Sequence, residues 1–121
     1  MSKINALLAA YAGLMGACGV AAAAGAAHVA GGEKLASVAL ILLVHASALL
    51  ALTLRPGRLW LAAGLVMAFG ATLFSLDVSL LALRGARLFP MAAPSGGTSL
   101  ILAWLLVFLA GLAQLRSRTL P

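Results

Sequence analysis

The chain alternates between long apolar runs and short segments that hold its charged residues. Four runs, nearly free of charge, cover residues 4–30, 35–54, 59–83 and 98–115. About 20 helical residues cross a hydrocarbon core about 30 Å thick, and each run is close to that length. Short connections between such helices favour antiparallel neighbours. The pattern therefore predicts an all-α fold, an integral membrane bundle of four antiparallel transmembrane helices that forms one domain over residues 1–121.

The connecting segments are rich in residues that end helices and resist burial in lipid. They cover residues 31–34, 55–58 and 84–97, and the last holds Pro90, Pro94 and the pair Gly96 and Gly97. Proline and glycine interrupt helices, and charge is costly in hydrocarbon. The first apolar run is too long, and its charged start too thin, for a cleaved secretory signal. We therefore expect it to remain as the first span.

Composition supports lipid as the solvent of this chain. Hydrophobic residues make up 64% of it and charged residues 8%, and the mean hydropathy is +1.17, whereas soluble domains carry about 25% charged residues. The net charge of +6 comes from Lys and Arg residues scattered singly or in pairs. Phosphate binding requires a clustered basic surface, so the scattering argues against nucleic acid as a partner.

The basic residues also predict which way the bundle faces. If the spans alternate, five basic residues share the side of the two termini and three share the other side. The five are Lys3, Arg55, Arg58, Arg116 and Arg118, and the three are Lys34, Arg84 and Arg87. Basic residues prefer the cytoplasmic side. We therefore expect both termini in the cytoplasm.

Small residues recur every four positions in the first run. They are Ala9, Gly13, Ala17, Ala21 and Gly25. Such spacing lets two helix backbones approach closely, which is a main packing device in membranes. We favour a packing face within the bundle, and a docking face for a partner chain is the alternative.

Ionisable residues inside spans are costly in lipid and are therefore candidates for function. Asp77 lies within the third run, His45 near the middle of the second and His28 near the end of the first. Alternating spans would place His28 and Asp77 at similar depth, with His45 within side-chain reach. Asp77 could instead pair with Arg84, or act as a proton relay or cation site. We expect a polar cluster of His28, His45 and Asp77.

Two histidines and a carboxylate form a sensible metal ligand set, but their spacing is not that of a metal motif. We therefore favour a hydrogen-bond network over a bound metal. No catalytic triad, phosphate loop or cofactor fingerprint occurs, so we expect neither an enzyme nor a cofactor. We interpret Trp60 as an interfacial anchor, Trp104 as a packing residue, and Cys18 as a small buried one.

Several residues, taken in order, resemble a known pattern. They are His28, His45, Leu73, Phe74, Ser75, Pro94, Gly96, Gly97 and Trp104. In this respect the chain resembles the family of small uncharacterised membrane proteins that includes transmembrane protein 256 and its bacterial relatives. Leu76, Asp77 and Ser79 depart from that pattern, which has Gly, Ser and Tyr there, so Asp77 is expected to belong to this branch alone. The resemblance implies four membrane helices in the bacterial cytoplasmic (inner) membrane, without supplying a reaction.

Two hypotheses about function follow. The first is a non-enzymatic accessory or structural subunit that packs in the bilayer against a larger membrane protein complex or against itself, because the helices are rich in close-packing residues. The alternative is a small transporter or a proton- or cation-conducting bundle that uses Asp77 with His28 or His45.

Overall fold

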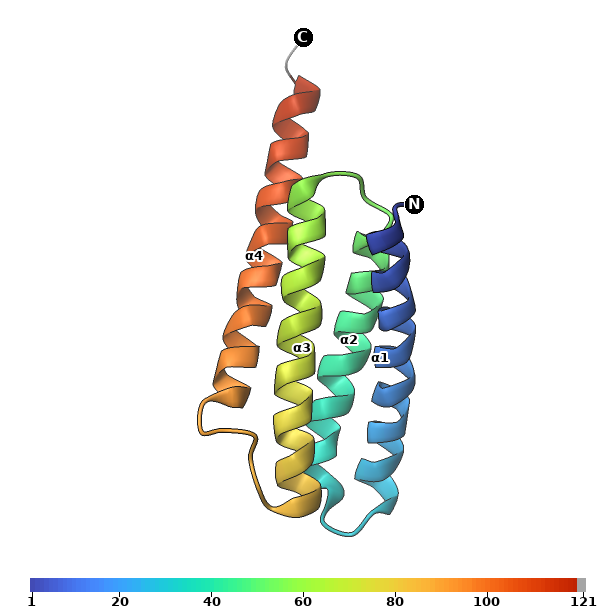
Figure 1. The fold of residues 1–121 in the computed structure, drawn as a ribbon, viewed down its shortest axis with the longest axis vertical. Coiled ribbons are helices and arrows are strands. Elements are labelled where there is room, and N and C mark those ends of the chain that lie inside the picture. The colour runs from blue at the N-terminus through green and yellow to red at the C-terminus, as the bar shows by residue number, and fades with distance from the viewer. Residues whose placement is uncertain (120–121) are drawn as a thin grey trace.

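A computed structural model describes residues 1–119 of the chain. This part forms four α-helices: α1 (Lys3–His28), α2 (Leu35–Leu52), α3 (Arg58–Arg84) and α4 (Ala92–Thr119), with a short 3-10 helix η1 (Gly32–Lys34) before α2. The helices run up and down side by side (Figure 1). All four are long and apolar enough to cross a membrane. The prediction of an all-α bundle of four helices is confirmed, and the protein is a multi-pass membrane protein.

The ends of the molecule match the alternation predicted from the sequence. The N-terminus, the α2–α3 connection and the C-terminal end of α4 lie at one end of the bundle, and the other two connections lie at the opposite end (Figure 1). Ser2 caps α1 by accepting a hydrogen bond from the backbone N–H of Asn5 at 3.2 Å. Gly85 ends α3 with φ of 68°, a left-handed conformation that favours glycine.

The fourth helix begins earlier than predicted. It starts at Ala92, whereas the sequence pattern placed its start at residue 98. Pro94 lies in the first turn, where backbone N–H groups have no partner within the helix and proline therefore costs no hydrogen bond. The prediction that proline breaks the helix at this position is therefore wrong. The fourth helix also ends at Thr119, four residues later than predicted, and the ends of the other three helices agree with prediction to within two residues.

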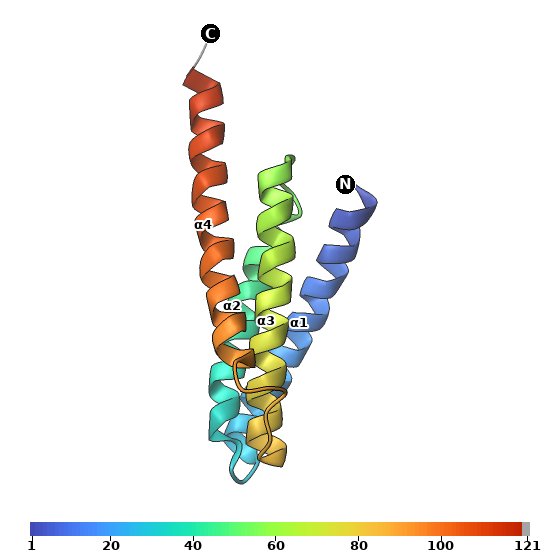
Figure 2. The same cartoon turned by 60° about the vertical axis from the view of Figure 1, so that its left-hand side comes forward.

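The two middle helices form the centre of the bundle. In the most apolar window of each helix, 44% of residues are buried in α2 and in α3, against 28% in α1 and 17% in α4. The last turns of α4 extend beyond the other helices (Figure 2). Large apolar side chains on α1 and α4 therefore face outward, as lipid allows.

The closest helix crossing joins α3 to α4 through Gly70 and Gly96. A Cβ atom on Gly96 would lie 2.6 Å from the backbone nitrogen of Phe74, and one on Gly70 would lie 2.8 Å from the carbonyl oxygen of Gly96. The two backbones are therefore in direct contact. This is the small-residue packing expected in lipid, but it joins α3 to α4, whereas the prediction placed a small-residue face on the first span.

The small-residue stripe of α1 does not form its packing face. The buried residues of α1 are Leu8, Ala12, Met15 and Gly19. The predicted stripe consists of Ala9, Gly13, Ala17, Ala21 and Gly25, of which the middle three are exposed and the outer two half-buried. The prediction of an intramolecular face is therefore corrected. The buried residues of α1 lie on a different face of the helix from the stripe. This face carries the large side chains Leu8 and Met15, whose burial is more favourable than that of alanine or glycine.

Candidate functional site

Asp77 is fully buried and holds the α3–α4 connection against α3. One of its carboxylate oxygens accepts a hydrogen bond from the guanidinium of Arg87, and the other accepts one from the backbone N–H of Leu88, each at 2.8 Å. The Arg87 side chain remains 43% exposed. The carboxylate thus has a counter-charge and also satisfies a backbone group in a non-helical segment.

These contacts correct two expectations about Asp77. Its basic partner is Arg87, and not Arg84, because the connection returns along the end of α3 and brings Arg87 back to the carboxylate. The expected cluster with the histidines is also absent from residues 1–119, where no three potential metal ligands lie close together. His28 is exposed at the end of α1.

His45 is paired instead with Trp104 of α4. The indole N–H of Trp104 donates to Nε2 of His45 at 3.1 Å, and Nδ1 of His45 lies 2.7 Å from the carbonyl oxygen of Ile41. Indole is only a donor, so Nε2 carries no proton and Nδ1 donates to Ile41. Both ring nitrogens are therefore engaged: Nε2 links α2 to α4 through Trp104, and Nδ1 bonds to the backbone within α2. Trp104, which we interpreted as a packing residue, is a specific hydrogen-bond partner.

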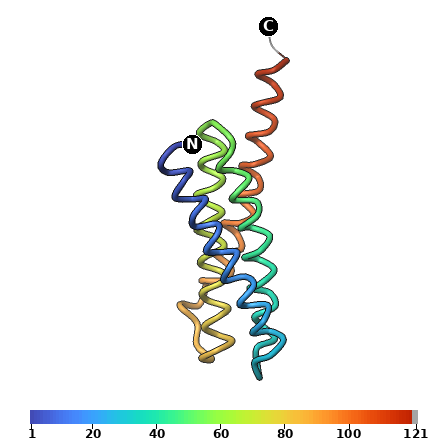
Figure 3. Tube along the Cα trace, turned by 90° about the vertical axis from the view of Figure 1, so that its right-hand side faces the viewer, coloured from blue at the N-terminus to red at the C-terminus, as the bar shows by residue number. Residues whose placement is uncertain are grey.

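A groove of about 420 Å³ runs between α1 and α3, with α2 as its floor. We call this the α1–α3 groove. Its wall from α1 consists of Tyr11, Leu14, Met15, Cys18, Ala21 and Ala22; its floor of Leu35, Val38 and Leu42; and its wall from α3 of Thr72, Ser75, Leu76, Ser79 and Leu83. Figure 3 shows α1 crossing the bundle obliquely to α3. Cys18 is exposed in this groove, contrary to the expectation that it is buried.

One end of the α1–α3 groove is closed by a hydrogen bond between two helices. The hydroxyl of Thr72 donates to the carbonyl oxygen of Ala68 at 2.7 Å, so the hydroxyl of Tyr11 donates to Thr72 Oγ1. This link holds α1 to α3 where they meet. Beyond it, the hydroxyls of Ser75 and Ser79 follow along the same wall.

Ser75 is the unusual member of this wall. Its side chain is 6% exposed, and its hydroxyl is the one buried side-chain polar group in the described part of the chain that has no hydrogen-bond partner. A serine in a helix can bond to the carbonyl four residues earlier. Ser75 does not do so, although it lines the α1–α3 groove.

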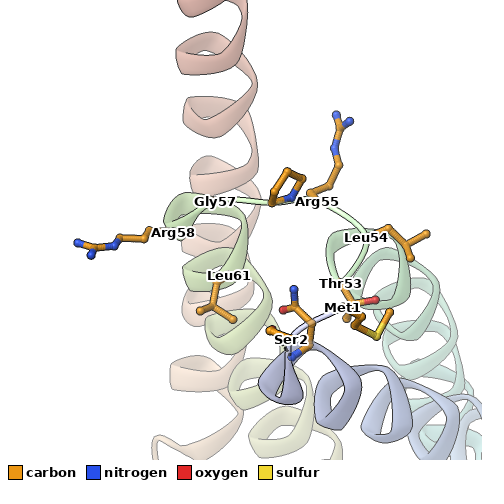
Figure 4. Close-up of a pocket in the computed structure, with 10 residues that line it drawn as sticks. Met1, Ser2, Thr53, Leu54, Arg55, Gly57, Arg58 and Leu61 are labelled. Atoms are coloured by element: carbon orange, nitrogen blue, oxygen red, sulfur yellow. Dashed lines mark hydrogen bonds between the residues drawn. The ribbon is translucent and has the colours of Figure 1, made fainter.

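A second hollow, of about 610 Å³, lies at the end of the bundle that holds the N-terminus. It is bounded by the start of α1 and the α2–α3 connection (Figure 4). The side chains of Arg55 and Arg58 point away from it (Figure 4), and the guanidinium of Arg55 lies 4.7 Å from the ring centre of Trp60. Its charged groups do not converge on a ligand, so we regard it as a space beneath the connection.

The sequence could not identify most of these contacts. His45 and Trp104 are 59 positions apart, Tyr11 and Thr72 are 61 apart, and nothing local links them. Asp77 and Arg87 are only ten positions apart, but nothing local favours Arg87 over Arg84 as the partner of the acid.

Comparison with known proteins places the chain in a family. A family model described as a protein of unknown function (DUF423) matches residues 15–97, from Met15 in α1 to Gly97 in α4. The matched region includes Asp77, His45 and Ser75. No solved structure matches the chain. The expectation of an uncharacterised family is confirmed, and the chain belongs to this family of unknown function.

Proposed function

We propose that the protein is a non-enzymatic accessory or structural subunit of the bacterial cytoplasmic membrane. It packs within the bilayer against a larger membrane protein complex or against another copy of itself. The observation that carries this proposal is the use of its buried ionisable groups: Asp77 holds the α3–α4 connection, and His45 holds α2 to α4. Buried polar groups that are satisfied within the fold make it rigid.

The exposed part of α1 supplies the surface for such packing. Gly13, Ala17 and Ala21 are exposed on one side of this helix, and a Cβ atom added at Gly13 would meet no atom within 4 Å. The surface is therefore shallow. A helix of another chain could approach it closely, as small residues allow in lipid.

The alternative function, a bundle that conducts protons or cations, has less support. Both carboxylate oxygens of Asp77 are occupied by Arg87 and Leu88, and both ring nitrogens of His45 are occupied by Ile41 and Trp104. A proton relay requires groups that hand a proton from one to the next. Asp77→Asn should therefore leave proton and cation flux into liposomes unchanged, and a loss of flux in this variant would favour conduction.

Copurification from membranes tests the leading proposal. Wild-type protein, extracted in mild detergent after cross-linking in the membrane, should migrate with a second copy or with a defined set of membrane proteins. Ala17→Leu should reduce this association at least severalfold, because the larger side chain keeps the partner helix away. Gly111→Leu is a matched control, because Gly111 is also exposed in a helix with no atom within 4 Å of an added Cβ.

The result also separates the two kinds of partner. A cross-linked product of twice the chain mass indicates self-association, and a larger set of proteins indicates a complex. The proposal is wrong if the wild-type chain runs as a lone monomer, or if both variants associate as the wild type does.

A further inference from the structure

The α1–α3 groove contains a hydroxyl that has no hydrogen-bond partner among residues 1–119. The hydroxyls of Ser47, Thr72 and Ser99 each donate to the carbonyl oxygen four residues earlier, at 2.7 to 2.9 Å. Ser75 makes no such bond, although its hydroxyl is buried and it lines the groove. An unpaired polar group at membrane depth is costly. A ligand that accepts a hydrogen bond from Ser75 would remove that cost.

The depth of Ser75 limits what that ligand can be. The 27 residues of α3 span about 40 Å, so a hydrocarbon core about 30 Å thick and centred on α3 leaves about 5 Å of helix at each end. Ser75 lies nine residues before Arg84, which places it roughly 9 Å inside the hydrocarbon. The ester groups of a phospholipid lie at the hydrocarbon boundary with its charged head. An acceptor at Ser75 must belong to an uncharged molecule that enters the core.

The size and lining of the groove point in the same direction. Its volume of about 420 Å³ lies within the range of roughly 300–1,000 Å³ found for small-molecule sites. No charged residue lines it, and aliphatic side chains form most of its floor and walls. Apolar lining with a few placed polar groups is typical of sites for largely hydrocarbon ligands.

We propose that the α1–α3 groove binds an uncharged long-chain lipid that places a carbonyl oxygen at the hydroxyl of Ser75. The hydrocarbon chain lies along Val38, Leu42 and Leu76, and the Tyr11–Thr72 hydrogen bond closes the groove beyond the carbonyl. A ring carbonyl of a quinone and an ester carbonyl of an acylglycerol both supply this chemistry. The binding is reversible and involves no covalent step.

Binding to the purified full-length chain in mild detergent tests this proposal. Decylubiquinone and monoolein are titrated separately, and the bound fraction is read by native mass spectrometry. At least one of them should bind with one molecule per chain. Ser75→Ala should weaken that binding about fivefold, which corresponds to the loss of one hydrogen bond. Ser47→Ala is the matched control and should bind as the wild type does, because Ser47 lies on α2 outside the groove.

Two further measurements separate the contribution of the Ser75 hydroxyl to binding from that of the apolar groove. Decylbenzene, which has no carbonyl, should bind the wild type and Ser75→Ala equally. Leu76→Trp, which fills the groove from an exposed position, should reduce the binding of all three molecules while helical content and elution volume stay unchanged. It also keeps the groove testable if Ser75→Ala does not fold.

The outcomes decide the matter. Ser75-dependent binding of decylubiquinone alone identifies a quinone, of monoolein alone an acylglycerol, and of both a site for the carbonyl itself. The proposal is overturned if neither binds, if Ser75→Ala binds them as the wild type does, or if phosphatidylethanolamine shows the same dependence on Ser75.

Discussion

Asp77 shows how a single acidic residue can serve structure in a membrane. The connection after α3 is not helical, and its backbone groups need partners where water is scarce. The carboxylate of Asp77 supplies one by accepting from the N–H of Leu88, and Arg87 neutralises its charge. The guanidinium keeps contact with the surroundings, since it is 43% exposed. A residue that resembles a transport site thus shapes a loop.

The two partners of this ion pair should not be equally sensitive to substitution. Arg87→Ala leaves a fully buried carboxylate without a counter-charge and should lower the free energy of unfolding by about 2 kcal/mol, below the usual range for a buried pair because Arg87 is half exposed. Asp77→Asn should cost about 1 kcal/mol, because the amide oxygen can still accept from Leu88. Unfolding in mixed micelles of detergent and dodecyl sulfate, followed by circular dichroism, measures both.

Arg84→Ala is the control for this comparison. Arg84 is basic, exposed and close in the chain, but it makes no ion pair with Asp77, so its loss should change stability by less than about 0.5 kcal/mol. If Arg84→Ala and Arg87→Ala cost the same, the assigned ion pair is wrong.

The important polar residues can be predicted from the sequence, but their partners cannot. Asp77 and His45 stand out because lipid makes any buried polar group costly. Their partners depend on tertiary structure. Arg87 meets Asp77 only because the connection turns back, and Trp104 meets His45 only because these two side chains reach each other across the space between α4 and α2. Neither fact has a local signal in the chain.

At the scale of elements, the packing of α3 on α4 depends on glycines that contact the backbone of the neighbouring helix. The α3–α4 crossing depends on Gly70 and Gly96, where the two backbones meet. The regular stripe of small residues on α1 misled the prediction, because spacing alone cannot tell a packed face from an exposed one. The start of α4 was missed for a related reason, since Pro94 is tolerated in a first turn.

Neighbouring glycines at the start of α4 allow a direct test of this crossing. Gly96→Ala places a Cβ atom 2.6 Å from the backbone nitrogen of Phe74, and should lower the free energy of unfolding by about 2 kcal/mol, as overpacking does. Gly97→Ala meets no atom within 4 Å, and should leave stability unchanged or raise it by up to about 1 kcal/mol, because alanine favours helix.

Thermal unfolding in detergent compares the two variants. A disulfide engineered between α3 and α4 close to this crossing should form more slowly in Gly96→Ala than in Gly97→Ala, because the added Cβ atom keeps the two helices apart. Equal stability of the two variants would show that the crossing is looser than described.

At the scale of the whole molecule, the distribution of basic residues predicts orientation. The N-terminus and the C-terminal end of α4 lie at the same end of the bundle, together with the α2–α3 connection (Figure 1). That end carries the larger share of Lys and Arg, including Arg116 and Arg118 on the part of α4 that extends beyond the bundle. The bias is five basic residues against three. The structure fixes the alternation, and the positive-inside rule supplies the direction.

Reporter fusions measure this direction. Green fluorescent protein fused after the C-terminus should fluoresce, and alkaline phosphatase at the same point should be inactive, because we expect the C-terminus in the cytoplasm. Reporters placed in the α3–α4 connection should behave in the opposite way. Active phosphatase at the C-terminus would reverse the assigned orientation.

The bond between Asp77 and Leu88 also bears on how the chain enters the membrane. The acid belongs to α3, but its two partners are made only ten and eleven positions later. A third span released into lipid by itself would carry an uncompensated charge, which is costly at that depth. We therefore expect α3 to wait at the insertion machinery until the connection has been synthesised, and then to leave with α4 as a hairpin.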